Sequence, residues 1–139
     1  MSGSIYDTAW VSLVSKSIGG VQTWLSPSSF RCICDVQTES GSWEGGCAVD
    51  EIINTLACLL SLKRHEKVDR NEVSGLTDRI EKATQFVAQR LSAWDISFTE
   101  RVAFEFLVPS MLDLLEGEGV HLNFSQSDAL RQLKQIKII

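Results

Sequence analysis

The sequence has few residues that break helices and no long apolar run. Only two prolines interrupt its 139 residues, and strict alternation of apolar and polar residues is never sustained, so strands receive little support. The longest uninterrupted apolar stretches span only a few residues, as at 56–60, which is too short for a helix that crosses a membrane. The first residues also lack the basic and apolar regions of a secretory signal, so we expect a cytoplasmic protein.

Positive charge is also scarce. Thirteen Lys and Arg residues against eighteen Asp and Glu give a formal net charge of −5. Because binding to a nucleic-acid backbone needs a basic face, this balance argues against a nucleic acid as the main partner. With 44% hydrophobic and 22% charged residues, the chain has the composition of a single soluble domain.

A cysteine–histidine metal site is not indicated. The four cysteines include no C-x-x-C pair, and His65 and His121 show no ligand spacing to each other or to a cysteine. Cys32 and Cys34 lie two residues apart on a predicted helix, so they point to different faces. We expect reduced thiols that pack as small core side chains, as is usual in cytosolic proteins.

Apolar residues recur at helical spacing along most of the chain and predict an all-α protein of about six helices. The predicted helices lie at about 4–18, ended by Gly19 and Gly20; at 26–34; at 50–63; at 76–94; at 99–116, interrupted by Pro109; and from 127 to the last residues. The polar stretch 65–75 predicts a loop.

Three segments resemble class II diterpene cyclases. The residues Ser4–Val11 resemble an S-x-Y-D-T-A-W-V opening, and Gln37–Trp43 with Asn54–Cys58 resemble a Q-x-x-D-G-S-W turn and an N-T-L-A-C helix. The residues Phe104–Ser110 are similar to a G-F-E-x-x-x-P-S-L helix. The three occur in the family's order over nearly the whole chain. Ser61–His65, where plant members tend to have a tryptophan, favours the fungal bifunctional copalyl diphosphate/kaurene synthases.

The resemblance implies a fold and an activity. Residues 1–18 would be the leading helix of a β domain, and residues 19–139 would be a barrel-like helical γ domain of a longer parent chain. Such enzymes cyclise geranylgeranyl diphosphate to copalyl diphosphate by protonation, in a cavity between the β and γ domains. They are isomerases, and a bifunctional parent would also carry a lyase domain.

The acid of that reaction is absent from this sequence. Neither the family's D-x-D-D motif nor the D-D-x-x-D magnesium motif of the ionising domain occurs. General acid catalysis needs a positioned proton donor, so we expect the chain alone to be inactive and to form one wall of the site, with the β domain as its partner. The alternative is a non-catalytic helical interaction module.

Glu105 is the predicted metal-binding residue. It lies between two phenylalanines, and Pro109, four residues later, cannot donate to its backbone carbonyl group. A carboxylate beside such an opened helix suits Mg²⁺, which takes one or two carboxylates plus substrate phosphate oxygens. In the resembling family the matching glutamate serves magnesium-dependent diphosphate binding. The alternative is a solvated glutamate that pairs with Arg101 one turn earlier.

Lys134 and Lys137 are the other predicted site residues. They form a K-x-x-K-I segment that is similar to the family's K-L-x-K-I, in which a lysine reaches the substrate diphosphate. An ammonium group neutralises phosphate without demanding planar geometry. The alternative is a pair of surface lysines near the C-terminus of a helix, where the helix dipole favours them.

Several other residues have predicted structural roles. Gln37, Gly41 and Trp43 fit the QW pattern of terpene cyclases, in which glycine permits a tight turn and the indole closes the end of a helix. Lys63 and Arg64 are expected to end a helix in water. Tyr6, Trp10 and Leu13 share one face of the leading helix. If its partner domain is missing, we expect this face to cause self-association or to leave the first helix poorly ordered.

Overall fold

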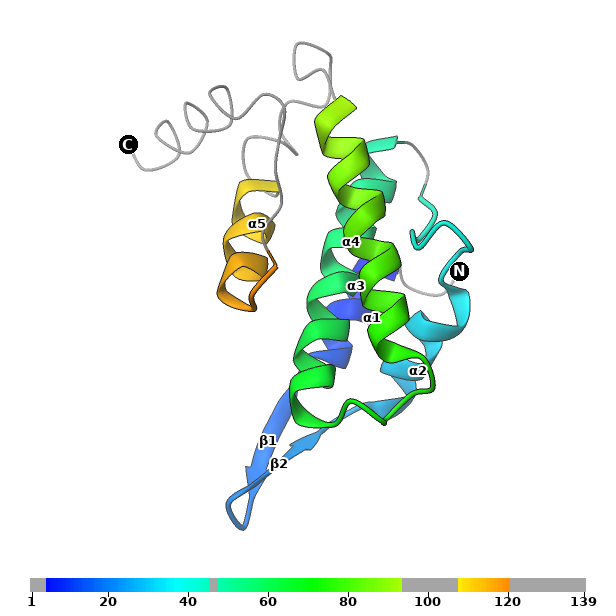
Figure 1. Cartoon of the computed structure of the whole chain (residues 1–139). Helices are drawn as coiled ribbons and strands as arrows, with labels where there is room; N and C mark the ends of the chain where they lie inside the picture. Colours follow the sequence, from blue (N-terminus) through cyan, green and yellow to red (C-terminus); the bar gives the residue numbers. More distant parts are fainter. Residues whose placement is uncertain (1–4, 46–47, 94–107, 121–139) are drawn as a thin grey trace, which may run out of the picture.

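The computed structural model describes residues 5–45, 48–93 and 108–120. Within these ranges the chain forms five helices and one hairpin (Figure 1). They are α1 (Ile5–Ser12), β1 (Ser15–Ile18), β2 (Val21–Trp24), α2 (Pro27–Val36), α3 (Ala48–Val68), α4 (Leu76–Ala93) and α5 (Val108–Gly117). The predicted all-α class is confirmed, with the hairpin as an addition. No described helix is long and apolar enough to span a bilayer.

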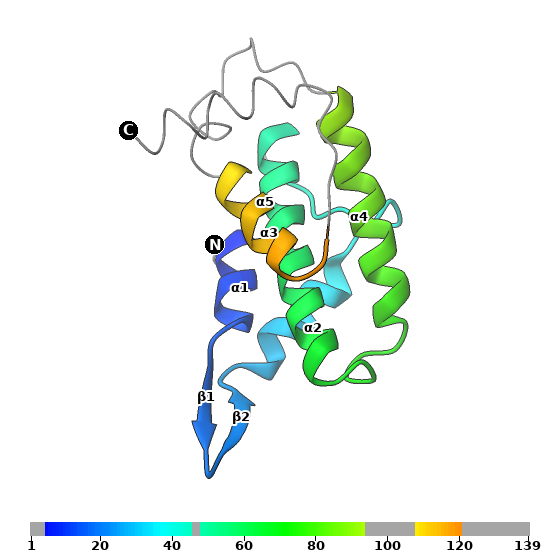
Figure 2. The same ribbon diagram turned by 60° about the vertical axis from the view of Figure 1, so that its left-hand side comes forward.

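Helix α3 is the centre of the fold. Every side chain from 52 to 62 is buried, which is the pattern of a helix that is covered on all sides. Helices α1, α4 and α5 all pack against it, and Figure 2 shows α3 between α4 and the pair α1 and α5. The central position of α3 fixes where the other helices can lie.

The predicted helix at 76–94 is confirmed as α4. Its buried side chains follow helical spacing and face α3. The members predicted from sequence are Leu76, Ile80, Ala83, Val87 and Leu91, all of which are buried. Trp94, the last predicted member, lies outside the described residues.

The predicted helix at 4–18 is wrong beyond Ser12. There the Ser12 hydroxyl donates to the Ala9 carbonyl at 2.5 Å, and the chain turns into strand β1. The two glycines do not end a helix but turn a hairpin, with φ angles of 59° at Gly19 and 83° at Gly20. Positive φ at both central residues matches the turn that suits the right-handed twist of paired strands.

The QW residues have the predicted structural role. The Trp43 indole is buried and donates to the Ile33 carbonyl at 2.7 Å, which ties the loop to α2. The Gln37 amide donates to the carbonyl groups of Gly41 and Arg79, each at 3.1 Å, which ties the loop to α4. Gly41 has φ 94°, and an added Cβ would lie 2.5 Å from the backbone of Lys82. Only glycine therefore fits at this position.

Two further helix boundaries differ from the prediction. Helix α3 continues through His65 to Val68, so the loop begins four residues later than expected. Pro109 is the second residue of α5 as described, a position where its missing N–H group costs nothing. The rest of the helix predicted at 99–116, and the helix predicted from 127, lie outside the described residues.

Helix α1 packs against α2 and α3 of the same chain. Tyr6, Trp10 and Leu13 are half-buried against the core, and the rings of Tyr6 and Trp10 meet edge to face with centroids 6.0 Å apart. These side chains therefore have a partner surface within the described part of the chain. Self-association and the division at residue 18 stay predictions.

Candidate functional site

The predicted diphosphate and metal residues lie outside the part of the chain that the structure describes. Glu105 precedes α5, while Lys134 and Lys137 follow it, and residues 94–107 and 121–139 are not described. Their roles stay predictions. The described element nearest to them in sequence is α5, which packs against α3.

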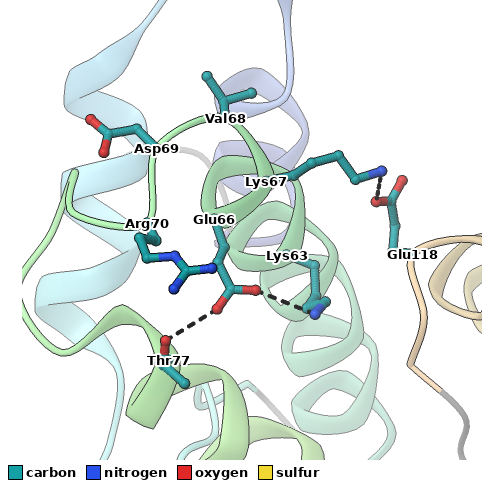
Figure 3. Close-up of a pocket in the computed structure, with 8 residues that line it drawn as sticks. All are labelled: Lys63, Glu66, Lys67, Val68, Asp69, Arg70, Thr77 and Glu118. Atoms are coloured by element: carbon teal, nitrogen blue, oxygen red, sulfur yellow. Dashed lines mark hydrogen bonds and ion pairs between the residues drawn. The ribbon is translucent and has the colours of Figure 1, made fainter.

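A charged groove lies where α3 ends, near the beginning of α4 and the turn after α5 (Figure 3). Its volume is about 650 Å³. The groove is lined by Lys63, Glu66, Lys67, Val68, Asp69, Arg70, Thr77 and Glu118. Basic residues gather here because the last turns of α3 carry them, and the helix dipole favours cations at a C-terminus.

Glu118 binds two cations of α3. Its Oε2 atom accepts from Arg64 Nε at 3.2 Å, and its Oε1 atom lies 2.9 Å from Lys67 Nζ. Oε1 is buried without a well-aligned hydrogen bond, so the ammonium charge is what satisfies it. The contact with Lys67, and then that with Arg64, lowers the pKa of Glu118 against the opposing effect of burial. These ion pairs form a latch between α3 and α5.

A hydrogen bond from α4 reaches an ion pair of α3 across the groove. Lys63 Nζ lies 3.3 Å from Glu66 Oε1, and the Thr77 hydroxyl donates to Glu66 Oε2 at 3.2 Å. The prediction that Lys63 and Arg64 end a helix is therefore wrong, because α3 runs on to Val68 and both side chains are half-buried in ion pairs.

The charges that line the groove are balanced. Its lining holds as many acidic as basic side chains, so it lacks the excess positive charge that attracts an anion. Among the described residues no group of three or more His, Cys, Asp or Glu side chains is placed to hold a metal ion. The chemistry of the groove is that of a salt-bridged contact between helices.

A buried histidine cluster lies beneath the hairpin, and sequence reasoning missed it. The His65 ring is stacked between Trp24 and Phe30, with centroids 3.8 Å and 3.7 Å away. His65 Nε2 lies 2.9 Å from the Ser12 carbonyl oxygen, which can only accept, so Nε2 carries a proton. His65 Nδ1 lies 2.8 Å from Glu72 Oε1. One side chain thus joins α1, β2, α2, α3 and the loop after α3.

The sequence held one signal for this cluster. His65 follows the buried residues Ser61 and Leu62 at spacings of four and three, which continues the face of α3. The polar residues around His65 concealed that spacing. The partners Trp24 and Phe30 are distant in sequence and could be found only from the folded chain.

Two of the three described cysteines, Cys34 and Cys58, are buried, whereas Cys32 is exposed. The prediction that Cys32 and Cys34 point to different faces is confirmed, but the prediction of a core side chain is wrong for Cys32, which lies on the outer side of α2. Burial raises the pKa of the Cys34 thiol to about 11 and raises that of Cys58 well above its ordinary value of 9.0. Because only a thiolate is an effective nucleophile, neither buried thiol is suited to catalysis.

Comparison with known proteins finds relatives along nearly the whole chain. It is 43% identical over 144 residues to phyllocladan-16-alpha-ol synthase of Phomopsis amygdali, which covers 99% of this chain and 14% of that enzyme. It is 43% identical to the bifunctional premutilin synthase of Rhodocybe pseudopiperita and 39% identical to the copalyl diphosphate synthase of Talaromyces verruculosus. The chain spans 13% and 15% of these two proteins. No protein-family model matches.

A solved structure has the same fold. The ent-copalyl diphosphate synthase of Arabidopsis thaliana, in complex with (S)-15-aza-14,15-dihydrogeranylgeranyl thiolodiphosphate, matches with a TM-score of 0.70 and 26% identity. The match covers 96% of this chain and 19% of the plant enzyme.

Proposed function

Because this chain belongs to the fungal diterpene cyclases as a segment of about one seventh of their length, we propose that it is part of a class II cyclase. The parent enzyme would convert geranylgeranyl diphosphate to copalyl diphosphate by protonation. The segment would be its γ domain, preceded by the first helix of the β domain. The observation that carries the proposal is the fold shared with a copalyl diphosphate synthase that binds a geranylgeranyl thiolodiphosphate.

The role proposed for this segment is to hold the diphosphate end of the substrate. Lys134 and Lys137 would neutralise phosphate oxygens, and Glu105 would supply a carboxylate oxygen to Mg²⁺. When bound, the ion would hold the diphosphate and offset its charge. Glu105 is the carboxylate that the resemblance proposes for this role, with substrate phosphate oxygens completing the donor set.

This segment would not supply the proton that starts the cyclisation. The sequence has no D-x-D-D motif, so the general acid would come from the rest of the parent chain. The segment would instead form one rigid wall of the cavity in which the substrate is cyclised, because its helices are held to α3 by buried side chains.

The test compares the 139-residue chain with its full-length parent. We expect the parent, supplied with geranylgeranyl diphosphate and Mg²⁺, to release copalyl diphosphate, which is detected by gas chromatography after dephosphorylation. The 139-residue chain under the same conditions should release none. Turnover by the short chain, or no prenyl diphosphate conversion by the parent, would contradict the proposal.

A further inference from the structure

Four apolar side chains are exposed on one face of the β1–β2 hairpin. The register pairs Ile18 with Val21, and the Leu25 amide donates to the Val14 carbonyl at 3.0 Å. Because side chains alternate across strands, these four residues lie on the same face. Their exposed fractions are 46% for Val14, 54% for Ile18, 65% for Val21 and 53% for Leu25. We call these four side chains the outer face.

The opposite face of the hairpin anchors it to the helices. Trp24, on that opposite face, stacks on the buried His65 ring at 3.8 Å with an interplanar angle of 12°. The hairpin projects beyond the helical body (Figures 1 and 2), so this stack holds the outer face in a fixed orientation. A face fixed in this way needs no ordering when it docks, which lowers the entropic cost of binding.

The size of the outer face limits what can cover it. Complete burial of an aliphatic side chain removes about 60–120 Å² of apolar surface, so four half-exposed side chains offer about 100–250 Å². A stable interface between separate proteins buries about 800 Å² on each partner. The outer face alone is therefore too small to hold two free copies together, but it suffices for a partner in the same polypeptide, where the effective concentration is high.

We infer that the outer face is the surface against which another part of the full-length polypeptide docks. The inference rests on the proposed function, in which these residues are a segment of a longer cyclase; the relatives are about seven times as long as this chain. Lys16 and its cross-strand neighbour Thr23 are exposed and lie on the same side of the hairpin, between the two apolar pairs. The partner surface is therefore apolar, with an acceptor such as a carboxylate opposite Lys16.

The test places a photo-crosslinking amino acid at position 18 of the full-length protein. The matched control carries it at position 36, because Val36 is 48% exposed but lies at the far end of α2. We expect an intramolecular crosslink from position 18 to a residue beyond 1–139, several-fold stronger than from position 36. Peptide mass spectrometry locates the crosslink.

The variant Ile18→Ser/Val21→Ser gives an independent measurement. It should lower the melting temperature of the full-length protein by more than that of the 139-residue chain, because in the shorter chain Ile18 and Val21 lose only their cross-strand contact with each other. Crosslinks only within 1–139, crosslinks between two copies, or equal yields at both positions would overturn the inference.

Cyclase activity is assayed in parallel to separate this inference from the proposed function. A full-length protein that forms copalyl diphosphate but gives no selective crosslink at position 18 would refute the docking surface alone. A protein that crosslinks as expected but converts no geranylgeranyl diphosphate would refute the cyclase proposal alone.

Discussion

At the scale of single residues, a buried histidine joins four elements of the fold and the loop after α3. His65 is enclosed by two aromatic rings and makes polar contacts with Ser12 and Glu72. A buried polar ring is stable only when such partners are present. The cluster therefore makes His65 a structural residue whose removal affects several elements at once.

Replacing His65 with alanine should cause a large loss of stability. The change leaves a cavity between Trp24 and Phe30 and strips the Ser12 and Glu72 contacts, so we expect the free energy of unfolding to fall by about 3–5 kcal/mol. Urea unfolding followed by circular dichroism measures it. Arg70→Ala, an exposed change in the loop after α3, is the control, and equal losses in both variants would contradict this role.

The cysteines should differ in reactivity according to burial. At pH 8, iodoacetamide should modify the exposed Cys32 in the native protein and reach Cys34 and Cys58 only after unfolding. The unfolded state releases the Cys34 proton near pH 9, whereas the folded state retains it to about pH 11. Stability should therefore decrease as the pH rises from 9 to 11. Native labelling of Cys34 as fast as Cys32 would refute the prediction.

Glu105→Ala in the full-length protein should lower magnesium-dependent cyclisation on the order of a hundredfold, as other lost electrostatic contacts do. A helix-surface glutamate contributes within about 0.5 kcal/mol to stability, so the melting temperature should hardly change. Lys134→Ala should weaken the reaction in the same direction, and the two effects should be less than additive. Unchanged activity and magnesium dependence in Glu105→Ala would exclude this site.

At the scale of elements, ion pairs hold α5 to α3. Glu118 follows α5 and contacts Arg64 and Lys67, two residues in the last turns of α3. Because the carboxylate is the form that makes these contacts, the latch depends on the charge of Glu118.

The latch predicts a pH dependence of stability. The pKa of Glu118 lies below its ordinary value of 4.5 in the folded state, so its stabilising contribution is complete above that value. The contribution is lost as the pH falls through the lower, folded-state pKa, because protonation removes both ion pairs. Glu118→Gln should reduce the acid-induced fall in melting temperature between pH 6 and 3, which differential scanning calorimetry measures.

Glu116→Gln is the matched control for the latch, because Glu116 is exposed on the same turn of the chain. It should leave the acid-induced fall in melting temperature unchanged. If the two variants behave alike, the charge of Glu118 does not hold α5.

The hairpin shows where element-level prediction failed. The spacing of apolar residues allows a helix that continues through 13–18, and Gly19 and Gly20 were predicted to end it. What selects the strand is the stack of Trp24 on His65, a contact across 41 residues that no local pattern contains. Local preferences are overridden by tertiary contacts where a residue gains a buried partner.

At the scale of the whole molecule, the sequence predicted the helices and their buried faces better than the polar contacts between them. The helical class and the face of α4 followed from apolar spacing, and both were found. The structural role of Trp43 followed from the resemblance to the QW pattern, and the buried indole has that role. The α3–α5 latch was missed because Arg64 and Glu118 lie 54 residues apart. The proposed diphosphate residues depend on resemblance alone, because spacing does not reveal which carboxylate meets a metal.

The histidine cluster has a consequence for how the protein is made. The partners of His65 among the described residues lie between Ser12 and Glu72, so residues 12–72 contain the groups that form the cluster. On the ribosome, segments assemble as they emerge when their contacts are already synthesised. We expect the hairpin and the first three helices to close around this ring while the rest is still being translated, with Glu118 attaching α5 to a surface that already exists.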